Sequence, residues 1–175
     1  MNVPNILSIS RIFLLIPIII FFENESYLLS IITFIIASVT DFLDGYIARK
    51  RNLVSKTGAL LDLLADKVFV SIILIWLTFA FGNISILVAA ILIISREISI
   101  SYLRLFIILN SKEIGDVAPD FFGKLKTAFQ MKGLGLILIT PITPYFFFNI
   151  SLALILLSAF ISWYSFFRYL KKWLV

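Results

Sequence analysis

Four aspartates are the residues of this chain whose types and spacing are best suited to chemistry. Asp41 and Asp44 are three residues apart, and Asp62 and Asp66 are four residues apart. Residues at these spacings share one helix face, so two adjacent helices can bring four carboxylates together. Their repulsion in an apolar setting calls for cations, and paired divalent ions are the usual arrangement for displacement at a phosphate ester. The spacing therefore predicts a two-metal site.

The chain contains no histidine and no cysteine. Disulfides and thiolate chemistry are therefore excluded, and carboxylates must supply both the metal ligands and the general base. Because oxygen ligands suit hard ions, we expect Mg²⁺ or Mn²⁺. A carboxylate near the metals is the expected base, unless the attacking hydroxyl is deprotonated through a metal ion itself.

Small and basic residues accompany the aspartates. Gly45 and Gly58 remove side chains where a ligand or a neighbouring helix must approach closely. Ala48, four residues after Asp44, keeps its helix face open, and Arg49 can donate two hydrogen bonds to phosphate oxygens. The alternative is that these residues cap helix ends and pack helices together. Four aspartates at this spacing favour the metal site.

Apolar helices must position these residues. The 175-residue chain is 61% hydrophobic with a mean hydropathy of +1.08, and several apolar runs approach the span of a bilayer. We expect an all-α polytopic membrane protein with one domain over residues 1–175, because no polar linker divides the chain. The six predicted transmembrane helices cover residues 5–22, 27–49, 58–81, 84–109, 121–140 and 145–171.

The basic residues predict the orientation of these helices. The connections after the first, third and fifth helices contain no Lys or Arg. The opposite side receives Lys50, Arg51, Lys56, Lys112, Lys124, Lys126, Lys171 and Lys172. By the positive-inside rule, both termini and the aspartate stretch face the cytoplasm. The net charge of +5 is therefore a topology signal, and no nucleic-acid partner is expected.

A second group of polar residues lies in the fourth and fifth predicted helices. Its members are Arg96, Glu97, Arg104, Lys124, Lys126 and Thr127. If these side chains face the bundle interior, they form a cationic pocket suited to a small phosphorylated alcohol. The alternative is that the basic side chains extend to the membrane surface.

The pattern D-x2-D-G-x2-A-R-x8-G-x3-D-x3-D runs from Asp41 to Asp66 without a mismatch. It is the signature of the CDP-alcohol phosphotransferases, a family that the chain resembles over nearly its whole length. The segments M-N-V-P-N-I-L-S-I-S-R, S-R-E-I-S-I-S-Y-L-R and G-K-L-K-T-A-F-Q-M are similar to the bacterial phosphatidylglycerophosphate synthase subfamily.

The resemblance implies roles for individual residues. Asp41, Asp44 and Asp62 would hold one metal ion, with Asp62 bridging, while Asp66 would help hold the second and act as general base. The residues assigned to the CDP-lipid are Asn5, Ser8, Gly45, Ala48, Arg49, Ser55 and Gly58. Many members have proline after the third aspartate, where this chain has Leu63, a departure that concerns helix geometry more than the ligand set. Relatives form homodimers, so a homodimer is implied.

The implied activity is transfer of the phosphatidyl group of CDP-diacylglycerol to sn-glycerol 3-phosphate, giving phosphatidylglycerophosphate and CMP. The implied location is the cytoplasmic membrane of a bacterium. One alternative is the same chemistry with serine, an inositol phosphate or phosphatidylglycerol as acceptor. Another is a cation transporter that uses the aspartates as an ion path, although the apolar outer halves of the second and third helices argue against a continuous path.

Overall fold

The protein is helical throughout the part of the chain that its structure, a computed structural model, describes. The backbone is described over residues 3–50, 56–110 and 121–174, and side chains over residues 10–40, 64–103, 106 and 125–171. These residues form no β-strand. The elements are α1 (Val3–Glu23), α2 (Tyr27–Lys50), α3 (Lys56–Phe81), α4 (Ile84–Asn110), α5 (Phe121–Leu138), the 3₁₀ helix η1 (Thr140–Ile142) and α6 (Tyr145–Leu174).

The prediction of six helices is confirmed, with every boundary within three residues of the expected position. The one informative difference is the end of α5, which stops at Leu138 instead of residue 140. Pro141 follows, has no N–H to donate and disfavours the α conformation in the residue before it. The chain therefore tightens into η1 before it turns back into α6.

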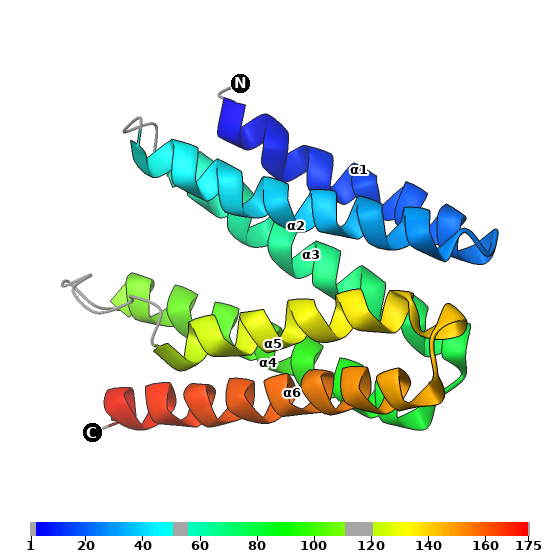
Figure 1. The fold of residues 1–175 in the computed structure, drawn as a ribbon. Helices are drawn as coiled ribbons and strands as arrows, with labels where there is room; N and C mark the ends of the chain where they lie inside the picture. The colour runs from blue at the N-terminus through cyan, green and yellow to red at the C-terminus, as the bar shows by residue number, and fades with distance from the viewer. Residues whose placement is uncertain (1–2, 51–55, 111–120, 175) are drawn as a thin grey trace.

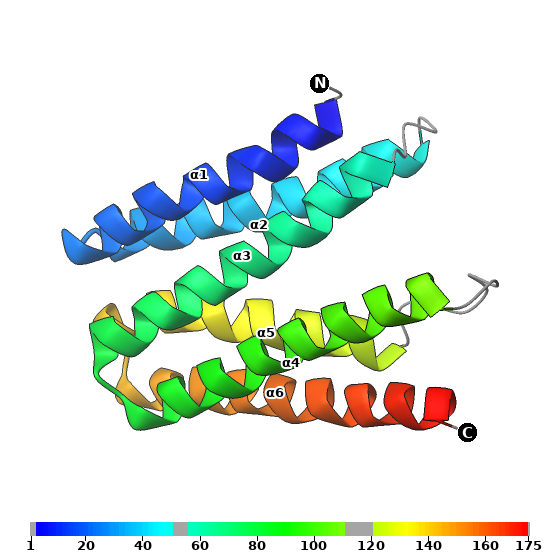
Figure 2. The ribbon, with the colours of Figure 1, turned by 180° about the vertical axis from the view of Figure 1, so that it is seen from behind.

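Successive helices run in opposite directions, which gathers their ends into two groups (Figures 1 and 2). The α1–α2, α3–α4 and α5–α6 connections lie at one end of the bundle. The start of α1, the end of α2, the start of α3 and the end of α6 lie at the other end, together with the end of α4 and the start of α5. The aspartate-bearing ends of α2 and α3 therefore share one end of the bundle.

Two groups of helices make up the bundle. α1 packs against α2 and α3, and α6 packs against α5 and α4, while contacts of α3 with α4 and of α2 with α5 join the groups. The rings of Phe34 and Phe69 lie 5.9 Å apart and link α2 to α3 near the middle of the bundle. Fully buried apolar residues such as Ile73, Leu77 and Ile93 fill the centre.

Two polar side chains inside the bundle donate hydrogen bonds to backbone carbonyls of neighbouring helices. The buried Ser30 Oγ donates to the Ile18 carbonyl at 2.9 Å and joins α2 to α1. The Trp163 indole N–H donates to the Leu92 carbonyl at 2.9 Å and joins α6 to α4. Because hydrocarbon offers no water as a partner, such bonds are the available way to satisfy polar side chains there.

Three helical segments with described side chains are long and apolar enough to cross a membrane: Leu64–Phe81, Ile84–Leu103 and Tyr145–Lys171. Tyr27–Thr40 is a shorter apolar segment. Large apolar side chains point outward along these helices, among them Phe79, Ile91 and Phe160. An apolar exterior of this kind fits a protein embedded in a bilayer.

Two glycines let α5 approach its neighbours closely. A Cβ added to Gly133 would lie 2.6 Å from Cγ1 of Ile155 and 3.1 Å from the carbonyl oxygen of Ser151 in α6. A Cβ added to Gly135 would lie 3.2 Å from the Phe34 ring of α2. The added Cβ at Gly133 would meet backbone atoms of α6 as well as a side chain, and backbone can move aside less easily than a side chain.

We expect Gly133→Ala to destabilise the protein more than Gly135→Ala, by about 1–3 kcal/mol, because it overpacks against the α6 backbone. Both changes gain roughly 1 kcal/mol of helix propensity, so the difference between them isolates the packing cost. Unfolding of both variants in detergent, followed by circular dichroism, measures that difference. Equal midpoints would contradict the packing argument.

Candidate active site

The four aspartates of the motif occupy matching positions on α2 and α3. Asp44 lies six residues before the end of α2, and Asp62 six residues after the start of α3. Asp41 and Asp66 lie nine and ten residues from the same two helix ends. At 1.5 Å per residue, these pairs lie about 9 Å and about 14 Å along their helices from the shared end of the bundle.

Asp66 is the motif aspartate whose side chain the structure describes. It is half-buried. Its carboxylate lies close enough to the Lys126 ammonium group on α5 for an electrostatic interaction. The next residue of α3, Lys67, contacts Glu97 of the predicted cationic pocket, so the predicted metal site and that pocket are neighbours along α3.

Many predicted site residues lie outside the described side chains. In the aspartate motif and on α1 these are Asp41, Asp44, Asp62, Asn5, Ser8, Gly45, Ala48, Arg49 and Gly58, and in the predicted acceptor pocket Arg104 and Lys124. Ser55 lies in the connection outside the described backbone. Their functional assignments stay predictions.

A buried ion cluster centres on Glu97 of α4. Its Oε1 accepts a hydrogen bond from Arg96 Nη1 at 2.9 Å and another from Lys126 Nζ of α5. Lys67 Nζ of α3 lies 3.8 Å from Oε2, donates to the Glu97 carbonyl at 3.4 Å and also bonds Ser101 Oγ. One carboxylate thus holds three cations from three helices.

Two of the cluster's basic side chains are held in the interior rather than at the membrane surface. Arg96 is 5% exposed, and its Nε donates to the Ser162 carbonyl of α6 at 3.0 Å. Lys126 is mostly buried against Glu97. Among the described side chains of the cluster, three cations face one carboxylate, and Asp66 interacts electrostatically with one of these cations, Lys126. Such a site suits an anionic ligand carrying a phosphate.

The structure brings together three of the predicted acceptor residues, Arg96, Glu97 and Lys126. Thr127 lies one residue beyond Lys126 and is exposed. Sequence reasoning missed Lys67, which completes the cluster. Its signal was a lysine directly after Asp66, inside an otherwise apolar helix.

Arg11 of α1 is a second residue that sequence reasoning missed. It is 1% exposed, on the same helix face as the buried Leu15 and Ile18, and it is engaged by other groups of the protein. It lies eight residues from the start of α1, so its distance from the shared end matches those of Asp41 and Asp66. A buried guanidinium requires compensating polar partners, which makes this level of the bundle strongly polar.

The donor set fits hard divalent ions. The four motif acids supply only carboxylate oxygens, which are the ligands that Mg²⁺ and Mn²⁺ prefer. Two helices present them at matched distances from one end of the bundle. The nearby cations of the Glu97 cluster are paired with that carboxylate.

Comparisons with known proteins agree with the motif. The family model for CDP-alcohol phosphatidyltransferase matches residues 1–165. Three relatives carry the name CDP-diacylglycerol–glycerol-3-phosphate 3-phosphatidyltransferase. The protein from Pseudomonas fluorescens is 35% identical over 98% of this chain and 89% of its own, and that from Rickettsia felis 36% identical over 98% and 97%. The Haemophilus influenzae protein is 40% identical over 77% of this chain and 74% of its own.

The family match covers both the aspartate motif of α2 and α3 and the Glu97 cluster of α3, α4 and α5. This chain belongs to the CDP-alcohol phosphatidyltransferase family.

Proposed function

We propose that this protein transfers the phosphatidyl group of CDP-diacylglycerol to sn-glycerol 3-phosphate, giving phosphatidylglycerophosphate and CMP. The observation that carries the proposal is the match to relatives named for these two substrates over nearly the whole chain. The unbroken aspartate motif and the buried cationic cluster beside Asp66 support it independently.

The aspartates carry the proposed chemistry. Asp41, Asp44 and Asp62 would hold one Mg²⁺ or Mn²⁺ ion, and Asp66 would help to hold a second. When bound, these ions neutralise charge on the pyrophosphate and on the phosphorus under attack. Asp66 accepts the proton of the acceptor hydroxyl as that oxygen attacks the β-phosphorus. The bond from this phosphorus to the CMP oxygen breaks, and CMP leaves.

The CDP moiety is proposed to lie against α1 and the end of α2. Its contacts come from Asn5, Ser8, Gly45, Ala48, Arg49, Ser55 and Gly58. The two glycines allow close approach of the nucleotide, and Arg49 suits its phosphate oxygens.

The Glu97 cluster is the proposed acceptor site. Arg96 and Lys126 bind the phosphate of glycerol 3-phosphate, with Arg104 and Lys124 nearer the bundle end and Thr127 one residue beyond Lys126. Glu97 holds the cations in place, and Lys67 of the cluster directly follows the proposed base, Asp66, in α3. Fixing the acceptor next to the base and the donor is itself a large part of the catalysis.

The one-sided distribution of basic residues supports a cytoplasmic site in a bacterial cytoplasmic membrane. Glycerol 3-phosphate and CMP are soluble, so they exchange at this end, while the acyl chains of the donor stay in lipid. We also propose that the protein acts as a homodimer, as its resemblance to the family implies.

Purified protein with Mg²⁺, CDP-diacylglycerol and glycerol 3-phosphate should release CMP and form phosphatidylglycerophosphate. Parallel reactions with serine, inositol phosphate or phosphatidylglycerol provide the comparison. CMP release with one of those acceptors, and none with glycerol 3-phosphate, would overturn the assignment of the acceptor. Ion flux in proteoliposomes without CMP release would instead favour a transporter.

Asp66→Asn should abolish turnover while the protein keeps much of its affinity for the CDP-lipid, because the proposed base is lost and the first metal site is kept. Asp62→Asn should lose metal and CDP-lipid binding together. Isothermal titration with the lipid in detergent, with and without Mg²⁺, separates the two. Equal loss of binding in both variants would refute this division of roles.

Lys126→Gln should raise KM for glycerol 3-phosphate by about 10-fold or more, with KM for CDP-diacylglycerol little changed, because a buried charged contact to a phosphate is removed. The matched control is Lys171→Gln, at an exposed lysine of α6 outside the cluster. Initial rates of CMP release measure both constants. A similar rise in KM for both substrates would indicate that Lys126 has a structural role and does not bind the acceptor.

A further inference from the structure

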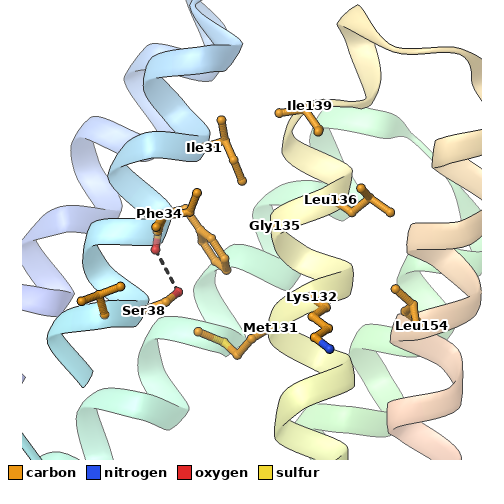
Figure 3. A pocket seen from close by; sticks show the side chains of 11 residues that line it. Ile31, Phe34, Ser38, Met131, Lys132, Gly135, Leu136, Ile139 and Leu154 are labelled. Atoms are coloured by element: carbon orange, nitrogen blue, oxygen red, sulfur yellow. Dashed lines mark hydrogen bonds between the residues drawn. The ribbon is translucent and has the colours of Figure 1, made fainter. Parts of the chain in front are cut away.

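An apolar groove of about 610 Å³ lies between α2 and α5 (Figure 3). Ile35 and Val39 line it from α2, Met131 from α5, and Ile139 from the turn that follows α5. Ile35 is 51% exposed, so its side chain faces the surrounding medium as well as the groove. The groove therefore opens toward the lipid, not toward the bundle interior.

The two ends of the groove differ in their distance from the aspartates. Ser38 lies at one end, three residues before Asp41, and Lys132 lies at a similar level on α5 (Figure 3). Ile31 and Ile139 lie at the other end. The eight residues from Ile31 to Ser38 span about 10 Å of helix. The groove is thus an elongated apolar channel whose inner end points at the aspartate motif.

Gly135 shapes the floor of the groove. A Cβ there would lie 3.2 Å from the Phe34 ring, which is itself buried. With no side chain at this position, α2 and α5 approach each other and the Phe34 ring closes the bottom. Among the described lining residues, Lys132 alone is charged, and it lies at the inner end.

We propose that this groove receives one acyl chain of the CDP-linked donor and that its walls, Ile35 above all, select which chain lengths are used. The proposal rests on the proposed function and adds a specificity determinant to it. The occupant must be apolar, elongated and attached to a polar head near Asp41, and Lys132 complements the negative charge of that head at the inner end.

The selection is by shape rather than by hydrophobic affinity. Lipid tails are as apolar as the side chains of the groove, so an acyl chain that leaves the bilayer for the groove gains little from apolar contact alone. What differs between chains is whether they pass along the walls without collision. A bulky side chain at Ile35 stands in the path of a long chain, whereas a very short chain leaves most of the groove empty.

The test uses Ile35→Trp with Ile36→Trp as matched control. These neighbouring isoleucines of α2 are 51% and 50% exposed, and only Ile35 is among the lining residues of the groove. Each variant receives an equimolar mixture of dihexanoyl and dioleoyl CDP-diacylglycerol in detergent micelles with glycerol 3-phosphate. Mass spectrometry of the products gives the ratio of specificity constants, which does not depend on how much enzyme is folded. Micelle partitioning of the donors cancels when variants are compared with the parent.

We expect Ile35→Trp to shift the product ratio toward the dihexanoyl lipid by at least about five-fold, with less than about two-fold change in Ile36→Trp. Ile139→Trp, on the opposite wall, should shift it in the same direction and replaces Ile35→Trp if that variant yields no active protein. An unchanged ratio in both groove variants, or an equal shift in Ile36→Trp, would overturn the proposal. Lipids of the surrounding membrane would then be the occupants of the groove. Absence of CMP release by the parent would overturn the proposed reaction, a result distinct from any change in ratio.

Discussion

The single carboxylate of Glu97 and the three cations around it are the interaction on which the rest of the structure depends. Lys67, Arg96 and Lys126 come from α3, α4 and α5, and Arg96 reaches α6 through the Ser162 carbonyl. A charge buried among apolar helices is costly unless it is paired, so these four helices must meet at this level. The ion cluster therefore fixes the position of α3 along its axis relative to α4, α5 and α6.

This position of α3 also joins the two parts of the proposed active site. Lys67 follows Asp66 directly in α3, so the residue that anchors the cluster is next to the last aspartate of the motif. Lys126 interacts with Glu97 on one side and with Asp66 on the other. A shift of α3 by one turn would separate the carboxylates from the cationic pocket, because one turn is about 5.4 Å.

The bilayer supplies the second constraint, and it separates the routes of the two substrates. The aspartate positions lie toward one end of the bundle, where we propose that the soluble molecules exchange. The α2–α5 groove opens sideways, along helices whose outer faces are apolar. A donor with a charged head and two acyl chains fits such an arrangement, because head and tail need opposite surroundings.

Local properties of the chain determined the six helices and the aspartate motif. Apolar runs long enough to span a bilayer leave little choice but helix, and spacings of three and four residues fix which aspartates share a helix face. Proline chemistry at Pro141, which ends α5 early, was also present in the sequence but was overlooked. Only the tertiary structure revealed that Lys67 joins the Glu97 cluster, that Arg11 is buried, and that a groove lies between α2 and α5. These depend on contacts between residues far apart in the chain, and the periodicity of one helix does not specify which neighbour its face will meet.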